Sequence, residues 1–188
     1  MLPKPVIVTG YDPEWPVWFE ALARVYRRAL SGLGVTVEHV GSTSVPGLAA
    51  KPILDIDLVI PSSTVLPEVR ERLAALGYRH EGDRGIPGRE SFACDDDDVP
   101  RDGNDVRPEL RVRWPAHHLY VCVAGASELE RHLRFRDWLR AHPDDADAYA
   151  RLKRRLAEVH GDDRERYTDG KSELIERILS SAGRSRSS

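Results

Sequence analysis

Residues 41–60 read GSTSVPGLAAKPILDIDLVI, and this stretch predicts the centre of the fold. A strand over residues 35–40 leads into the Gly-Ser turn that opens it. The segment 54–60 is apolar apart from two acids, which is typical of a central strand covered on both faces. Because side chains alternate along a strand, Asp55 and Asp57 are expected to project from the same face.

Two neighbouring carboxylates on one face of a sheet predict a positively charged partner, because each negative charge disfavours the other. A divalent metal that carries a nucleotide phosphate would supply that charge. The turn at Gly41, Ser42 and Thr43 can bring backbone N–H groups and a hydroxyl to the phosphate. The alternatives are a solvent-facing pair of acids at a sheet edge and a plain strand-to-loop turn, in which glycine supplies an unusual φ angle.

Two basic residues are further candidates for phosphate binding. Lys51, between the turn and the acidic strand, either neutralises a phosphate as a point charge or is a solvated loop lysine. Arg89 follows a glycine in GIPGRES, where it can clamp a phosphate or carboxylate with two hydrogen bonds or form a surface salt bridge. Both alternatives stay open at this point.

The layout resembles the signature of the nucleotidyltransferase superfamily, in which a Gly-Ser turn holds the triphosphate and an Asp-x-Asp pair binds the metals. The stretch is similar, more closely, to the GrpB-like family (UPF0157-type), with counterparts at Gly41 to Leu48, Lys51-Pro52 and Asp55-Ile56. The resemblance extends over nearly the whole chain. Its other matches are Tyr11-Asp12-Pro13 with Trp15 and Phe19, Gly88-Arg89 with Phe92, His117 to Val121, Phe135 to Arg140, and Tyr149, Lys153, Tyr167 and Lys171.

This resemblance implies an enzyme that transfers a nucleotidyl group from a nucleoside triphosphate to an unknown acceptor. Asp55 and Asp57 would be its catalytic residues and would hold Mg²⁺. The alternative is a non-catalytic domain that binds a nucleotide or a coenzyme-A-related molecule, since GrpB-like domains also occur fused to dephospho-coenzyme A kinase. A role in assisting protein folding has been attached to such domains, but no coiled-coil pattern or exposed apolar run in this sequence supports it.

The superfamily usually has a third carboxylate on a later strand, and no clear one is present here. Glu90 and Glu109 are candidates, and His118 can stand in as a neutral metal ligand. His117 and His118 are adjacent in a predicted strand, so only one of them can join the acids. Tyr120 occupies the place of the family's second histidine, which weakens the prediction of a metal ligand there.

Two pairs in the C-terminal part share a Tyr-x-x-x-Lys spacing, which puts each pair on one helix face. They are Tyr149 with Lys153 and Tyr167 with Lys171. Core aromatics with solvated lysine heads explain the spacing, and binding of a substrate by the lysines is the alternative.

Composition narrows the classes of function. The 188 residues suffice for one domain with a substantial core, and a net charge of −3 with both signs interspersed argues against a dedicated nucleic-acid binder. Two cysteines, Cys94 and Cys122, predict no disulfide framework and suit a reducing compartment. No signal peptide or membrane-spanning run is recognised, so we expect a cytoplasmic protein that binds a nucleotide or another phosphorylated small molecule.

The order of the expected elements predicts an α+β fold, with a nucleotidyltransferase-like mixed β-sheet flanked by helices and followed by a helical segment. Residues 1–125 form the expected core, 126–182 form helices packed on it as one compact unit, and 183–188 form a disordered tail. A charged loop is expected over 95–105. Helices are expected from Asp12-Pro13 to Leu30 and over 67–76, 127–142, 146–159 and 172–182, and strands over 35–40, 54–60, 78–81, 90–94, 110–114 and 119–123.

Overall fold

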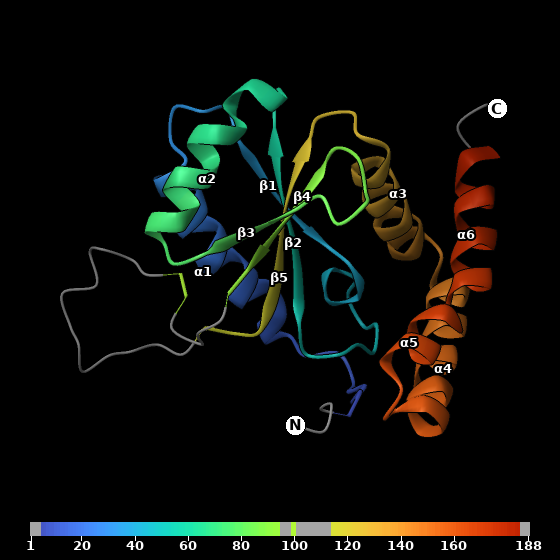
Figure 1. The fold of residues 1–188 in the computed structure, drawn as a ribbon. Coiled ribbons are helices and arrows are strands. Elements are labelled where there is room, and N and C mark those ends of the chain that lie inside the picture. Colours follow the sequence, from blue (N-terminus) through green and yellow to red (C-terminus); the bar gives the residue numbers. More distant parts are fainter. Residues whose placement is uncertain (1–4, 95–98, 101–113, 185–188) are drawn as a thin grey trace.

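The structure is a computed structural model that describes residues 5–94, 99–100 and 114–184. Its strands form one mixed sheet of five in the order β1-β2-β5-β4-β3, with helices on both sides (Figure 1). The strands are β1 (Thr36–Val40), β2 (Leu54–Ile60), β3 (Arg79–Gly82), β4 (Arg89–Ala93) and β5 (His117–Val123). The helices are α1 (Glu14–Ala29), η1 (Ser42–Ser44), η2 (Ser63–Val65), α2 (Leu66–Ala75), α3 (Ser127–Ala141), α4 (Pro143–His160), α5 (Arg164–Asp169) and α6 (Ser172–Arg184).

These elements confirm the predicted α+β mixed sheet flanked by helices. The boundaries differ at a few places. Helix α4 begins at Pro143, earlier than predicted, because proline suits the first turn of a helix, where no backbone N–H is needed. The sequence pattern does not predict the six-residue helix α5. Helix α6 continues to Arg184, while residues 185–188 of the predicted tail lie outside the described part of the chain.

Strand β4 lies between β3 and β5 in the sheet. β4 pairs antiparallel with both β3 and β5. The strand predicted over 110–114 lies outside the described residues except for Trp114, which is in no strand. The charged loop predicted over 95–105 is described only at residues 99–100.

Strands β2 and β5 run parallel at the centre of the sheet and set the position of the acids. In their register Asp55 is the partner of His118 and Asp57 is the partner of Tyr120. Strand β1 pairs antiparallel with the other side of β2, and residues 41–53 connect the two strands. The Gly-Ser turn continues into η1, whose N-cap is Gly41.

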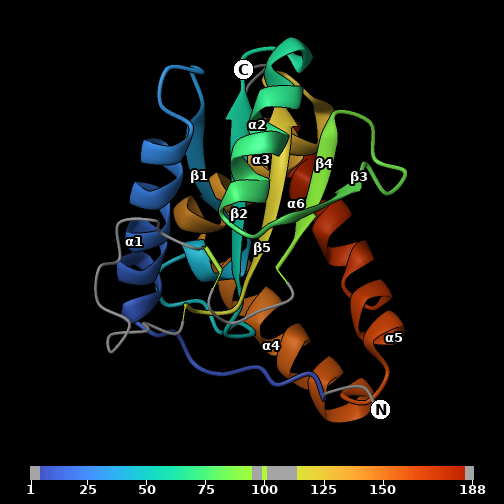
Figure 2. The ribbon, with the colours of Figure 1, turned by 60° about the vertical axis from the view of Figure 1, so that its left-hand side comes forward.

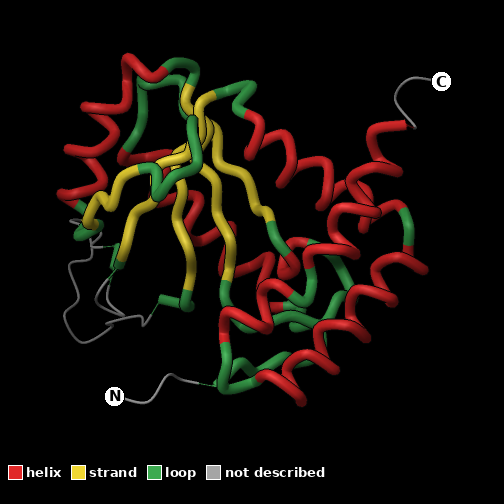
Figure 3. The backbone as a smooth tube through the Cα atoms, turned by 45° about the vertical axis from the view of Figure 1, so that its right-hand side comes forward, coloured by secondary structure: helices red, strands yellow, loops and turns green. Residues whose placement is uncertain are grey.

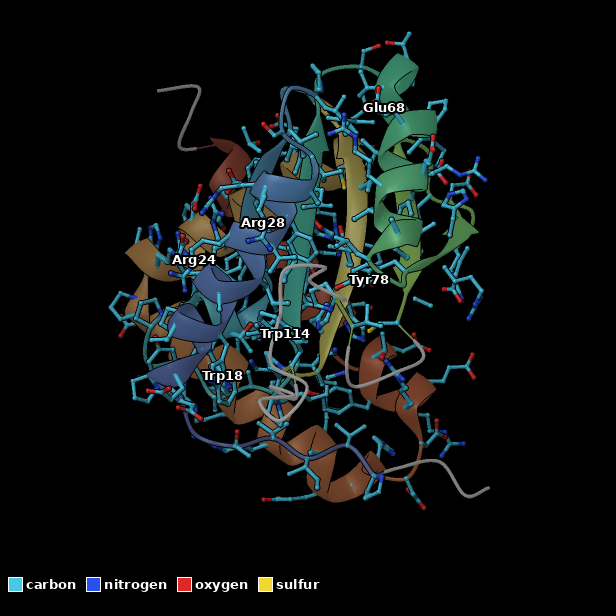
Figure 4. All side chains as sticks on the ribbon, turned by 90° about the vertical axis from the view of Figure 1, so that its left-hand side faces the viewer. Trp18, Arg24, Arg28, Glu68, Tyr78 and Trp114 are labelled. Carbon is cyan, nitrogen blue, oxygen red and sulfur yellow. The ribbon has the colours of Figure 1, made fainter. Side chains whose placement is uncertain are left out.

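One hydrophobic core fills the space between the sheet and α1 and α2 (Figure 2). Helix α1 begins where Asp12 Oδ1 accepts a hydrogen bond from the Glu14 N–H, at 2.9 Å, as a capping acid does. Its inward face buries Trp15, Leu22 and Tyr26 against the apolar face of β2. Tyr78, which follows α2, belongs to the same cluster and is labelled in Figure 4.

A second apolar cluster joins the C-terminal helices to the segment after the Gly-Ser turn. Figure 3 shows these helices gathered on the side of the sheet away from α1. They contact the turn segment through Val45, Leu48 and Ala49, which pack with Leu139, Tyr149, Ala150 and Ile178. None of the helices in the described ranges is long and apolar enough to cross a membrane.

Candidate functional site

A cavity of about 260 Å³ lies where the Gly-Ser turn, the start of β2 and β5, and helices α3 to α6 meet. Its walls contain most of the residues that the sequence singles out, together with several that it does not. The cavity is lined by Gly41, Ser42, Thr43, Ala50, Lys51, Ile53, Asp55, His118, Arg131, His132, Phe135, Tyr149, Lys153, Tyr167, Lys171 and Ile175.

The Gly-Ser turn packs directly against the first acid of β2. Gly41 has a φ of 69°, in the left-handed region that favours glycine. A Cβ atom at this position would overlap the Asp55 carboxylate, so both the backbone angle and the close approach require glycine. Ser44 Oγ donates to the Gly41 carbonyl at 2.6 Å and closes the turn.

Two arginines of α3 hold this turn in place. Arg136 donates to Glu38 Oε2 at 2.7 Å and to the His39 carbonyl at 3.1 Å. Arg140 donates to the Ser44 carbonyl through two nitrogens, at 2.8 and 3.1 Å. Charged donors to backbone carbonyls are strong hydrogen bonds, so the turn is fixed from the helical side as well as by the sheet.

Asp55 is the acid that faces the cavity, and its side chain is 35% exposed. His118 Nδ1 lies 2.9 Å from Asp55 Oδ1, so the imidazole is a hydrogen-bond partner of the carboxylate. His117 points to the opposite face, where its Nε2 lies 2.6 Å from the Tyr78 hydroxyl. The prediction that only one of the two histidines joins the acids is therefore confirmed.

Asp57 lies on the same face as Asp55 but has no exposed surface. Its Oδ2 is 2.7 Å from His132 Nδ1, and the other nitrogen of that ring is 3.1 Å from Glu128 Oε1. Burial alone lowers the pKa of His132, but the two carboxylates outweigh it and raise the pKa to about 9. A cationic histidine thus neutralises Asp57, while Asp57 Oδ1 has no partner in the described part of the molecule.

The predicted metal ligands are close together, but they do not form a complete metal-binding site by themselves. Asp55 and Asp57 share one face of β2, and His118 lies beside Asp55. Within the described ranges, no three histidine, cysteine or acidic side chains are grouped so that they could hold a metal ion. Glu90 lies 2.6 Å from His80 Nε2 instead of near the acids, and Glu109 lies outside the described residues. Asp57 Oδ1 is buried and has no hydrogen-bond partner among the described residues, so this carboxylate oxygen is suited to bind a cation.

Three lysines reach the cavity from different parts of the chain. Lys153 of α4 is almost completely buried, and its Nζ donates to the Ala49 carbonyl and lies 2.8 Å from Ser42 Oγ. Burial, with Lys171 and Arg154 nearby, lowers the pKa of Lys153 to about 7. Burial also lowers the pKa of Lys171 to about 8 and that of Lys51.

The lysines lie over tyrosine rings, as cation–π pairs do. Lys153 Nζ is 4.5 Å from the centre of the Tyr149 ring, and Lys171 Nζ is 4.5 Å from that of Tyr167. Lys51 Nζ lies 5.9 Å from the same Tyr167 ring. The Tyr-x-x-x-Lys pairs therefore face the cavity, and their lysine heads are not solvated surface groups.

The charges around the cavity favour an anion. Three lysines and Arg131 line it, against Asp55 as the one acid among the lining residues. The depressed pKa values have a common cause, which is that several cations are held together in a partly desolvated space. A ligand with several negative charges would relieve this repulsion.

Arg89 does not line the cavity. Its guanidinium lies over the Tyr120 ring, 4.5 Å from the centre, and 3.7 Å from Glu128 Oε1. It reaches the Asp57 side of the site through Glu128 and His132.

The site residues that the sequence analysis does not identify come from α3: Glu128, Arg131 and His132. The spacing of Glu128 and His132 by one helical turn is the signal that was available.

Comparisons with known proteins cover almost the whole chain. The sequence model of a family described as "GrpB protein" matches residues 5–181. A UPF0157 protein of Pseudomonas aeruginosa is 41% identical over 171 residues, which cover 91% of this chain and 65% of that protein. A UPF0157 protein of Halalkalibacterium halodurans is 39% identical over 190 residues, which cover 94% of this chain and 82% of the relative.

The solved structures include one close match. The crystal structure of conserved protein GrpB from Enterococcus faecalis aligns with a TM-score of 0.78 and 32% identity, covering 97% of this chain and all of that chain. Among the relatives by sequence, a dephospho-CoA kinase of Mycolicibacterium paratuberculosis is 29% identical over 159 residues, covering 80% of this chain and 39% of that protein. A chain of the Cid1 poly(U) polymerase aligns with a TM-score of 0.47 and 11% identity, covering 78% of this chain and 45% of that chain, a likeness too low to bear on function.

Proposed function

Because this chain belongs to the GrpB family, we propose that its cavity binds a nucleoside polyphosphate and that the acids beside it serve nucleotidyl transfer to an acceptor. The observation that carries the proposal is the gathering of Lys51, Lys153, Lys171 and Arg131 around the Gly-Ser turn, next to Asp55. A triphosphate has the charge that such a group of cations needs. The base and the acceptor are not specified by these contacts.

The lysines and the turn would bind and orient the phosphates. Ser42 and Thr43 offer hydroxyl groups at the cavity wall, and Lys51 and Lys171, which line the same cavity, offer ammonium groups. Point charges of this kind lower the cost of bringing an electron-rich attacking oxygen to a phosphate. Tyr167 would form the floor under both ammonium groups.

Asp55 and Asp57 would be the protein ligands of Mg²⁺. Magnesium usually binds through one or two carboxylates together with substrate phosphates and water, so the absence of a cage of three acids in the described residues does not conflict with the proposal. When bound, the metal supplies positive charge at the phosphate that is attacked. His132 would hold Asp57 in its orientation, and His118 would do the same for Asp55.

The second candidate function is binding without turnover. It is favoured by the ion pair between Asp57 and His132, which already neutralises the second acid. The partial identity to a protein named dephospho-CoA kinase makes a coenzyme-A-related phosphate a reasonable ligand for such a domain. In this version the cavity holds the phosphates and no nucleotidyl group is transferred.

Calorimetric titration with ATP, GTP, CTP and UTP, with and without Mg²⁺, tests the binding. We expect one of them to bind, and Lys171→Met to weaken that binding by about tenfold, since one charge contact of about 1.4 kcal/mol corresponds to that factor. Arg155→Met removes an exposed cation from the helix that carries Lys153, and it is the matched control that should bind as the wild type does. Equal affinity in wild type and Lys171→Met would contradict the proposed binding site.

Release of pyrophosphate separates the two candidate functions. Steady Mg²⁺-dependent release that is lost in Asp55→Asn supports nucleotidyl transfer. Binding that survives in Asp55→Asn, with no release in either protein, supports the non-catalytic domain. A failure of all four nucleotides to bind would exclude the nucleotide proposal itself.

A further inference from the structure

The distribution of lysine in this chain is uneven. Only four of the 28 lysine and arginine residues are lysines: Lys4, Lys51, Lys153 and Lys171. Three of them line the cavity, and Lys4 lies outside the described residues. Arginine would serve as well as lysine for a fixed positive charge, and it supplies nearly all positive charges elsewhere. An amine differs from a guanidinium in that it can lose its proton in a protein.

Among the three, Lys153 is bonded to a hydroxyl that faces the cavity. Its Nζ is 2.8 Å from Ser42 Oγ and also donates to the Ala49 carbonyl. Ser42 is half-buried, lies at the start of η1 and contributes to the cavity wall. The Lys153 side chain is 2% exposed and is held over the Tyr149 ring, so the pair has a defined geometry.

Burial makes the neutral form of Lys153 accessible near neutral pH. Lys153 Nζ donates to the Ala49 carbonyl and to Ser42 Oγ. When the amine is neutral it has a lone pair, which can accept the Ser42 hydroxyl proton at the same short distance. Burial, followed by Lys171 and Arg154, lowers the pKa of Lys153 to about 7, while Asp55 acts in the opposite direction and Lys51 in the same one. A base with a pKa near neutrality is well matched to proton transfer at the pH of a cell.

We propose that Ser42 is a nucleophile and Lys153 its general base, so that the cavity carries out a covalent phosphoryl-transfer step on its own serine. The identification of the phosphoryl donor as a bound polyphosphate rests on the proposed function. In the step, Ser42 Oγ forms a bond to phosphorus and its proton passes to Lys153 Nζ. The bond from that phosphorus to the bridging oxygen breaks, and the rest of the polyphosphate leaves with the electron pair.

Neighbouring groups support each part of this step. Lys51 and Lys171 lie on the same cavity and neutralise charge on the phosphate and on the leaving group. Lys153, once protonated, remains bonded to the Ala49 carbonyl and can return its proton to the leaving oxygen. No oxidant or reductant takes part, and the product is a phosphate ester at Ser42.

A small fluorophosphonate, diisopropyl fluorophosphate, tests the pair without any nucleotide. This probe transfers its phosphoryl group to an activated serine and loses fluoride, so intact mass and peptide mapping report the reaction and its place. We expect modification at Ser42, at a rate that rises as the pH passes through about 7. Ser42→Ala should remove the modification. Lys153→Arg keeps the charge but not the base, and it should slow the reaction by about 100-fold or more.

Arg155→Lys is the matched control, because it changes an exposed cation of the same helix and leaves Ser42 and Lys153 in contact. It should be modified at the wild-type rate. Thermal melting must show that Lys153→Arg is folded, and Lys153→Met provides a second variant if it is not. An unmodified Ser42 in folded wild type, or equal rates in wild type and the Lys153 variants, would overturn the proposal. The probe needs no polyphosphate site, so a failure of nucleotide binding leaves this result unaffected.

Discussion

At the scale of single residues, the site depends on how closely Gly41 approaches Asp55. The turn brings the glycine backbone against the carboxylate, and the left-handed φ of 69° allows the next residues to enter η1. The residue type and its place before the acidic strand are visible in the sequence. The contact itself is not, because it depends on the antiparallel pairing of β1 and β2, in which Val40 is the partner of Asp55.

Gly41→Ala and Gly47→Ala form a matched pair that isolates this contact. Both glycines have positive φ angles, of 69° and 79°, but a Cβ at Gly47 would meet no atom within 4 Å. We expect Gly47→Ala to lower the free energy of unfolding by about 1–2 kcal/mol through its backbone angle. Gly41→Ala should cost a further 1–3 kcal/mol or so through its overlap with Asp55. Urea unfolding checks both values, and equal losses would contradict the close packing.

At the scale of elements, α3 connects the sheet to the cavity through one polar stripe. Glu128, His132, Arg136 and Arg140 follow one another at intervals of four, so they lie along one face of the helix. His132 contacts Asp57 of the sheet, and each of the two arginines donates to a backbone carbonyl near the turn. Sequence patterns predict the helix, but charged residues at this spacing are also typical of a solvated face. Their inward orientation could not be predicted locally.

His132→Ala tests the ion pair that this helix makes with the sheet. The pKa of His132 rises from 6.5 to about 9 on folding, so the folded state binds the extra proton between these values. Its stabilisation is therefore complete below pH 6.5 and is lost as the pH rises through about 9. At about pH 6.5, we expect the free energy of unfolding of the variant to be lower than that of the wild type by about 3 kcal/mol, because Asp57 remains buried without its partner.

Urea unfolding across this pH range measures the difference in unfolding free energy between wild type and His132→Ala. The pKa values of Lys153 and Lys171 fall on folding, so these lysines make the free energy of unfolding change with pH in the opposite direction. Both proteins share this contribution, and it cancels in the difference. Glu130→Gln, at an exposed position of α3, is the control and should change little at any pH. A difference that does not decline toward pH 9 would mean that His132 is not a cation in the folded protein.

At the scale of the whole molecule, the cavity exists only where the sheet and the C-terminal helices meet. The sheet side supplies the turn, Lys51 and Asp55, and the helical side supplies Tyr149, Lys153, Tyr167 and Lys171. The second apolar cluster holds the two sides together. Neither side contains the complete set of charges, so binding and stability are expected to be lost together when the helices are removed.

Truncation after Ala141 tests this dependence. It removes α4 to α6 and exposes Val45, Leu48 and Leu139, which the second cluster buries. We expect the melting temperature to fall by at least about 10 °C, since each 1 kcal/mol shifts a domain of this size by about 2–4 °C. A chain that ends at Arg184 is the control. Retention of the wild-type melting temperature by the shorter chain would show that residues 1–141 fold without these helices.

The sequence alone determined the local parts of this protein. Alternation placed Asp55 and Asp57 on one face, the glycines and prolines placed the turn, and capping signals with apolar periodicity placed the helices. These features depend on neighbours a few residues away, for which backbone geometry sets the rules. The resemblance to a family followed from the same residues in the same order.

Only the tertiary structure decided the partners of those residues. Lys153 meets Ser42 across 111 positions, and His132 meets Asp57 across 75. Such contacts depend on how α3 and α4 pack against the sheet, and apolar patterns do not specify which charged side chains turn inward. The pKa values follow from that packing, because burial and neighbouring charge act through space and not along the chain.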